Sequence, residues 1–494
     1  MVSNRTVVTL FYIFLVHALV ASTPATVSAT NLAKDREVGI LVAKIAKLKG
    51  SGSESAKLAL AELQMQLGAI YQENGEFSKS QTCFSTALQI RSQPGSGQTP
   101  EVPFRSDPSN DTTRTQRDEL RGSYSGSSLA AGQARHSKEL LIAQSKMWLG
   151  DSLRAQGKFS DAEKYLTEAH KSIEANAPAS IEEATSLNRL ASLYNNWGNF
   201  SKAESLQREA LAIAEKHLKA ADNEIAIHKL LLADTLRQQG KYKAAEPYLQ
   251  AAVANLKKAN PRSREYAAAL NNLGALYFWM GDYSRAEPLL ERGLNLREEI
   301  CGNEHIDVAN SLGDLAALNY QKANYTVAQK LFQKALAIRE KQLGTNHPLT
   351  ASTMSNLGNV YATTGQTAKA KTMLTKAVSI KERTLDPNSP DLAQGLNDLA
   401  ELCIDARDFQ QAERLVNRAK TIREKTLGKT NPDLAASWRT EARLNLQRGK
   451  LEQAKEDAQR ALAIYNKALA PNHPELRETK ALLNAITKKQ SKRN

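Results

Sequence analysis

Apolar residues recur three and four positions apart along most of the chain, which is the pattern of amphipathic helices. Short polar connections containing glycine, asparagine or proline separate these blocks. The stretch "NNLGALYFWMGDYSRAEPLLERGL", residues 271–294, holds two blocks on either side of Gly281. Glycine ends a helix in the left-handed conformation without penalty, so the stretch predicts two helices joined by a tight turn. Asp282 and Ser284 then favour the start of the second helix.

The same arrangement recurs along the chain. A small residue follows the repeat leucine at nine places, and from the second place onward the steps are 41 or 42 residues. These positions are Gly68, Gly150, Ala191, Ala233, Gly274, Ala316, Gly358, Ala400 and Ala442. The turn glycine is replaced in two copies, by Ala323 and Arg407. Since one hairpin cannot cover its own apolar face, neighbouring copies must stack.

The motif Leu-Gly/Ala, Tyr, Gly-x-Tyr/Phe, Ala, Ala resembles the tetratricopeptide repeat (TPR). The longer period and connections such as "LGTNHPLTA" and "LDPNSPDLA" resemble the kinesin-light-chain type of this repeat. Pro348, Pro390, Pro432 and Pro474 stand where a following helix begins, a position that proline tolerates. The resemblance implies an all-α fold, a right-handed superhelical solenoid of antiparallel helix hairpins.

The pattern also predicts boundaries. We expect a signal peptide over 1–29, an N-terminal helix with the first repeat over 30–91, a flexible linker over 92–135, eight contiguous repeats over 136–467, a capping helix over 468–487 and a basic tail over 488–494. The linker is rich in Gly, Pro and Ser, a composition that cannot form a packed core. The first repeat is therefore either tethered flexibly or docked on the main array with the linker looped out.

The N-terminus has the pattern of a targeting segment. Arg5 precedes an uncharged apolar run over 6–21, and the small residues Val27, Ser28 and Ala29 suit a signal peptidase. This predicts an exported mature chain, periplasmic or extracellular, without stable membrane insertion. The alternative is a chain tethered to the membrane by an uncleaved signal anchor.

The residues that carry chemistry are scattered. Cys83, Cys301 and Cys403 are an odd and widely spaced set, which indicates buried free thiols rather than a disulfide framework. His347 and His473 occupy the same "NHP" connection, so the repeat itself explains them. No metal-ligand spacing, phosphate loop or nucleophile elbow is found in the sequence. We therefore expect neither an enzyme nor a cofactor.

The net charge of +14 comes from 66 Lys and Arg against 52 Asp and Glu, mixed along the helices. Such mixing is typical of a solvated, ion-paired helical surface. We expect no nucleic-acid partner. The alternative function is an exported structural or adhesive protein that binds anionic glycan or envelope components through its basic surface.

The preferred function is a scaffold that binds a peptide or protein segment in the concave groove. The resemblance implies that the first helix of each repeat lines this groove. Asn is a mediocre helix former, so several on one face suggest amides that bind a peptide backbone. Phe278 and Trp279 beside Arg237 suit an anchor, because aromatics and Arg dominate binding hot spots. The predicted partner-binding residues are Asn188, Asn195, Arg237, Asn271, Phe278, Trp279, Asn359 and Asn397.

Overall fold

The structure is a computed structural model that describes residues 27–49, 53–73, 77–93, 138–156, 158–218, 222–469 and 473–492. Residues 1–26 of the predicted signal peptide and residues 94–135 of the predicted linker lie outside the described residues. The described part contains helices and no strand. No described helix combines the length and apolar character needed to cross a bilayer. The predicted all-α solenoid of antiparallel helix hairpins is confirmed.

The chain divides into two compact units, which are described separately. The N-terminal unit comprises residues 17–193 and 205–220, and the C-terminal unit comprises residues 194–204 and 221–494. The helices that lie wholly or mainly in the N-terminal unit are α1 (Val27–Leu48), α2 (Glu54–Glu73), α3 (Phe77–Ser92), α5 (Lys138–Ala155), α6 (Phe159–Asn176), α7 (Ile181–Trp197) and α8 (Phe200–His217).

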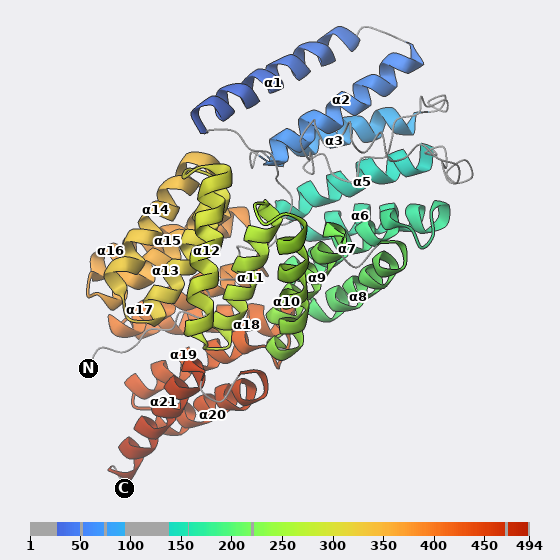
Figure 1. The fold of residues 1–494 in the computed structure, drawn as a ribbon. Helices are drawn as coiled ribbons and strands as arrows, with labels where there is room; N and C mark the ends of the chain where they lie inside the picture. Colours follow the sequence, from blue (N-terminus) through green and yellow to red (C-terminus); the bar gives the residue numbers. More distant parts are fainter. Residues whose placement is uncertain are drawn as a thin grey trace. The chain divides into compact units, whose positions relative to one another are not determined.

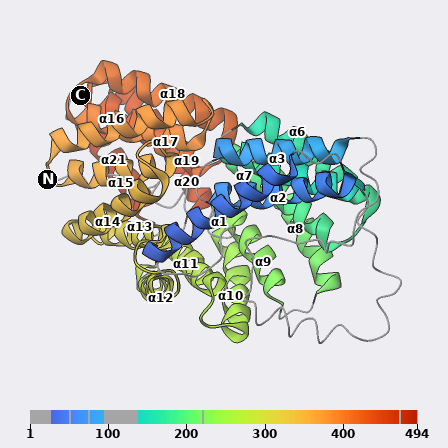
Figure 2. The ribbon, with the colours of Figure 1, turned by 90° about the horizontal axis from the view of Figure 1, so that it is seen from above.

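The C-terminal unit is built from consecutive hairpins, which follow one another in chain order from green to red in Figures 1 and 2. Its helices are α9 (Asn223–Gln238), α10 (Tyr242–Ala259), α11 (Arg264–Trp279), α12 (Tyr283–Cys301), α13 (Ile306–Gln321), α14 (Tyr325–Leu343), α15 (Pro348–Thr363), α16 (Thr367–Thr384), α17 (Pro390–Asp405), α18 (Phe409–Leu427), α19 (Pro432–Gln447), α20 (Leu451–Ala468) and α21 (Pro474–Ser491). From α11 onward the odd-numbered first helices begin at residues 264, 306, 348, 390, 432 and 474, so the predicted 42-residue period is present in space.

Helix starts follow the sequence signals. At the connections that precede α15, α17, α19 and α21, proline takes the first helical position and the residue before it caps the helix. His347 and His473 accept the backbone N–H of Leu349 and Glu475 through Nδ1, at 3.1 and 3.2 Å. The prediction that the repeat explains these histidines is confirmed.

The turns inside the hairpins use the left-handed conformation. Gly281 has φ +78°, as predicted for a helix-ending glycine, and Asp282 caps α12 by accepting the N–H of Arg285. Ala323 and Arg407, which interrupt the glycine pattern in the sequence, adopt φ +61° at the same place. The hairpin thus imposes its turn on residues that do not favour it.

Side chains from two or three successive helices form each described cluster of the core. One cluster joins α12, α13 and α14, so the second helix of one repeat packs on both helices of the next. Its buried members are Leu294, Val308, Ala309, Leu312, Ala335 and Ile338. At the C-terminus, Ile486 of α21 is buried against Ala442, Ala454 and Ala458. The helix α21 therefore covers the last repeat, and it continues to Ser491, into the segment predicted as a basic tail.

The first repeat packs on the second inside the N-terminal unit. Arg91 of α3 is buried and donates to the carbonyl of Leu141 at 3.0 Å and to Ser145 Oγ at 2.8 Å, both in α5. Of the two arrangements that the sequence left open, the structure has the docked one.

Candidate functional site

Asparagines on the first helices connect neighbouring repeats of the C-terminal unit. Asn271 Nδ2 donates to Ser311 Oγ at 3.0 Å and to Asp314 at 2.9 Å, on the first helix of the next repeat. Asn397 makes the equivalent bond to Thr440 Oγ1 at 3.1 Å, and Asn195, at another position of its repeat, donates to Thr235 Oγ1 at 2.7 Å. Their amide nitrogens therefore hold adjacent first helices together.

The side-chain oxygen of Asn271 also lies inside the protein, against Gly293 of α12. A Cβ added to Gly293 of α12 would lie 2.0 Å from Asn271 Oδ1. Gly293 replaces the alanine that the other copies have at this position, and its missing methyl group makes room for the asparagine. Asn271 is 2% exposed, so it acts as a packing residue of the hairpin in this structure.

A set of buried cations recurs on the second helices, four residues after the second small residue of the repeat. Its members are Arg91, Arg297, Arg339, Lys381 and Arg423. Arg297 donates to the carbonyl of Asp307 at 3.1 Å and to Ser311 Oγ at 2.9 Å. Arg339 is fully buried and bonds the next first helix in the same way. We call this set the cation ladder.

The partners of the cation ladder vary with the cation. In the uninterrupted repeats, a hydroxyl residue stands 14 positions after each arginine and accepts from it: Ser311, Thr353 and Ser437. Lys381 instead has Gly395 at that position, and its ammonium bonds Asp391 at 2.8 Å. The sequence prediction missed this ladder, although the pairing of arginine with a hydroxyl residue 14 positions later is visible in the letters.

Two carboxylates are buried beside the ladder. Asp314 and Asp398 occupy the same position in their repeats and are 3% and 5% exposed. Burial raises the pKa of Asp314 to about 7, against the opposing effect of its bond from Asn271 and of nearby arginines. Burial likewise raises the pKa of Asp398 to about 6. These groups lie among ordered hydrogen bonds, so we assign them to the core of the solenoid.

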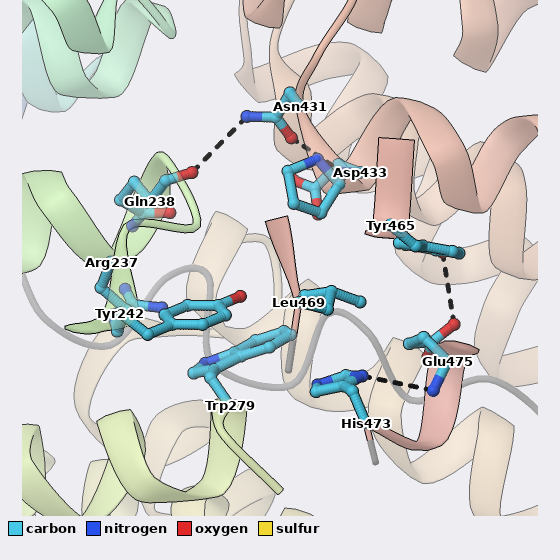
Figure 3. Close-up of a pocket in the computed structure, with 11 residues that line it drawn as sticks. Arg237, Gln238, Tyr242, Trp279, Asn431, Asp433, Tyr465, Leu469, His473 and Glu475 are labelled. Atoms are coloured by element: carbon cyan, nitrogen blue, oxygen red, sulfur yellow. Dashed lines mark hydrogen bonds between the residues drawn. The ribbon is translucent and has the colours of Figure 1, made fainter. Parts of the chain in front are cut away.

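A pocket opens elsewhere in the C-terminal unit, where the ends of α9 and α11 approach the beginnings of α19 and α21 (Figure 3). Tyr242 and Trp279 lie together on one side, and Tyr465 and Glu475 lie on the other. The lining residues are Arg237, Gln238, Tyr242, Trp279, Asn431, Pro432, Asp433, Tyr465, Leu469, His473 and Glu475.

The pocket joins segments that are far apart in the sequence. Asn431 Nδ2 donates to the carbonyl of Gln238 at 3.5 Å, across 193 positions, while its Oδ1 caps α19 by accepting from Asp433 N at 2.8 Å. Gly281, in the turn after α11, also lies close to the start of α21, since an added Cβ would be 3.7 Å from Pro474 Cδ. The hairpin turns of the early repeats therefore contact the connections of the late repeats.

The titratable groups of the pocket are engaged with the protein. Burial raises the pKa of Glu475 to about 7, although Arg439 pairs with it at 2.5 Å and Tyr465 OH donates to it at 3.3 Å. Burial lowers the pKa of His473 to about 4. The His473 ring caps α21 through Nδ1 and also bonds the backbone of Trp279. Both roles hold the imidazole as a structural group.

Family models of the tetratricopeptide repeat match residues 61–94, 141–216, 224–299, 265–341, 307–383 and 385–479. The chain belongs to the tetratricopeptide repeat family. Among solved structures, it is similar to BtubC (BKLC) from P. vanneervenii, with 24% identity over 47% of this chain and 91% of the other, and a TM-score of 0.36. It is also similar to a Rap protein complexed with Competence and Sporulation Factor, with 14% identity over 71% and 99% of the chains and a TM-score of 0.43. A comparison with curated proteins gives no match.

The predicted partner-binding residues of this TPR protein fall into three groups. Asn195, Asn271 and Asn397 bond the next first helix, and Asn359 bonds the Asp398 carboxylate. Asn188 lies on α7 in the N-terminal unit.

Arg237, Phe278 and Trp279 form the third group. Arg237 and Trp279 both line the pocket, and Phe278 packs edge-on against Trp279, while their role as an anchor for a partner stays a prediction. Arg237 also pairs with Asp234 at 2.7 Å.

The inner faces of α11, α15 and α17 are covered in this TPR array. Every residue of α11 from Tyr266 to Trp279 is buried. The side-chain amides of Asn195, Asn271 and Asn397 donate hydrogen bonds to the neighbouring repeat. The sequence had suggested that they would bind the backbone of a partner peptide instead. A partner-binding role for them stays a prediction.

The three cysteines agree with the sequence prediction. Cys83, Cys301 and Cys403 are buried free thiols. Burial raises the pKa of each thiol to about 11, so the reactive thiolate is disfavoured.

Proposed function

We propose that this TPR protein is a non-enzymatic scaffold that binds a segment of a partner protein at the pocket of Figure 3. The observation that carries the proposal is the meeting of Arg237 and Trp279 with Asn431 in one hollow of the C-terminal unit. The repeat fold itself presents surfaces and does not specify chemistry, so the argument rests on this site.

The pocket suits an anchor side chain of a partner. The apolar side chains of Tyr242, Trp279 and Leu469, each 7–8% exposed, line the pocket together with the polar Asn431 and Asp433. A bound segment would contact these lining residues at the opening of the pocket.

Binding is favoured over catalysis because His473 and Glu475, two titratable groups of the pocket, are engaged with the protein. Its histidine is a helix cap bonded through both sides of the ring, and Glu475 is paired with Arg439. A general base must reach the proton that it abstracts, which these contacts prevent.

The test begins with capture of partners by the mature chain and identification by mass spectrometry, followed by measurement of Kd. The key variant is Trp279→Gln, because the next repeat has Gln321 at the equivalent position. A hot-spot aromatic is worth at least about 2 kcal/mol, so affinity should fall by about 30-fold. The matched control is Gln321→Ala, which should bind as the wild type does.

The proposal fails if Trp279→Gln folds normally by circular dichroism and keeps full affinity. The salt dependence of binding distinguishes this proposal from the alternative function. Binding of anionic glycan through dispersed lysines and arginines should collapse at high ionic strength, because screening acts over about 10 Å at 0.1 M salt. Binding in the pocket should persist.

We also propose that the chain is exported, on the basis of the apolar run over 6–21 and the small residues at 27–29. Fusion of residues 1–29 to a reporter that is active only outside the cytoplasm tests this. Cleavage near residue 29 supports a released chain, and an uncleaved membrane-bound fusion supports the signal-anchor alternative. A reporter retained in the cytoplasm contradicts export.

A further inference from the structure

Three potential ligands converge at the connection between α6 and α7, in the N-terminal unit. His170 and Glu174 lie one turn apart on α6, and Glu183 lies in the first turn of α7. Residues four apart occupy the same face of a helix. One ligand atom from each of the three side chains lies within 4.8 Å of the others.

We propose that His170, Glu174 and Glu183 form a binding site for a divalent first-row transition-metal ion of the zinc class. An imidazole nitrogen and two carboxylates are the ligands that such ions take, at about 2.0–2.2 Å. Glu174 is exposed, so its side chain is able to swing inward and complete the set. The same exposure leaves a path for the ion and for water ligands.

The hydrogen bonds around His170 fix its ring for this role. Ser186 Oγ donates its single proton to the carbonyl of Glu183 at 2.8 Å. With its proton directed to that carbonyl, Ser186 Oγ is free to accept from His170 Nδ1, which lies 2.9 Å away, in the tautomer protonated on Nδ1. The neutral imidazole then carries its proton on Nδ1 and its lone pair on Nε2, the arrangement of a metal-ligating histidine held by a second partner.

Glu183 is positioned independently of any ion. It is 7% exposed, and its Oε2 accepts the N–H of Ala179 at 2.5 Å, where the backbone takes φ +51°. This contact holds the connection in place. A carboxylate has about four acceptor positions on its two oxygens, so one backbone bond does not use up its capacity to ligate.

A second group of potential ligands in the protein shows what disqualifies a site. Cys301, His305 and Asp307 also lie within 4.8 Å of one another. There, however, Asp307 is paired with Arg264 and His305 Nδ1 already caps α13. An added cation would have to displace a buried arginine. Among the described residues, the group at His170 has no ion pair to displace, which is why we assign the site there.

The experiment uses the untagged mature chain after chelator treatment, titrated with ZnCl₂ by calorimetry and with CoCl₂ by visible absorption. We expect one ion per chain, with tetrahedral Co²⁺ bands. Glu174→Ala and His170→Ala should each weaken binding by about 100-fold, and Ser186→Ala, which removes only the second partner, by about 10-fold. The matched control is His217→Ala, an exposed histidine on α8 that should change nothing.

Because Glu174 is exposed, its variant should fold even if His170→Ala does not, so the comparison remains decisive. Absence of saturable binding overturns the proposal. Equal binding by Glu174→Ala and the wild type also overturns it, since the ion would then be held elsewhere. Loss of binding in His217→Ala would move the site to α8 and has the same consequence.

Discussion

Replacing Asp314 by Asn should stabilise the protein at neutral and alkaline pH. Asp314 is 3% exposed, and burial raises its pKa from 3.8 to about 7, despite the bond from Asn271 and the nearby arginines. Above pH 7 the folded protein must hold a buried carboxylate. Asparagine has the same shape, keeps an oxygen that accepts from Asn271, and carries no charge.

The magnitude follows from linkage between proton binding and folding. Between pH 3.8 and 7 the unfolded chain has lost the Asp314 proton and the folded chain has kept it. The stability that this group contributes is present below pH 3.8 and is lost as the pH rises through 7, at about 1.36 kcal/mol per pH unit. The gap between Asp314→Asn and the wild type should therefore grow by about 3 kcal/mol from pH 5 to pH 8.

Urea unfolding followed by circular dichroism at pH 5, 6.5 and 8 measures this gap. Asp398→Asn is an internal comparison, because the pKa of Asp398 is raised only to about 6 and the gap should stop growing near that pH. The exposed Asp161→Asn should shift stability by less than about 0.5 kcal/mol at every pH. If Asp314→Asn destabilises the protein at pH 8, attraction to the arginines outweighs desolvation and the reasoning is refuted.

Four further substitutions and one double variant test the packing. Gly293→Ala should destabilise the protein by about 1–3 kcal/mol through a clash with Asn271 Oδ1, and the added change Asn271→Ser should restore stability, both read from the urea midpoint. Ala323→Gly and Arg407→Gly should each raise the free energy of unfolding by up to about 1 kcal/mol, because glycine adopts φ +61° without strain. A lower free energy of unfolding would show that alanine and arginine are unstrained in this turn. Arg339→Met should cost about 2–4 kcal/mol, since it leaves the buried acceptors Thr353 Oγ1 and Asn310 Oδ1 without the Arg339 donor, and an unchanged midpoint would contradict a stabilising ladder.

The hairpins were predictable because their signals are local. Proline at the first helical position and glycine at the helix end act within a few residues, whatever the rest of the chain does. Even Ala323 and Arg407, which break the glycine rule, keep the turn, since the packed helices on both sides determine it. The repeats in the sequence therefore predict the repeats in the structure, including the two copies that lack the turn glycine.

The roles of the asparagines were not predictable in the same way. An amide that bonds the next helix and an amide that bonds a partner look alike in one repeat. The difference lies in the distance from Asn271 to Ser311, which only the packing of two repeats defines. The cation ladder was overlooked for a related reason. Charged residues are seldom buried, so a periodic arginine suggests a solvated face unless its hydroxyl partner 14 residues later is noticed.

The pocket could not be predicted from repeat letters at all, because it depends on the curvature of the C-terminal unit. In a solenoid, small rotations between neighbouring repeats accumulate along the array. Asn431 reaches the carbonyl of Gln238 only if the rotations across the intervening repeats add up correctly. Arg297, Arg339 and Lys381 bond successive repeats in that interval through buried contacts. These bonds are among the contacts that set the angles between repeats, on which the distance from Asn431 to Gln238 depends.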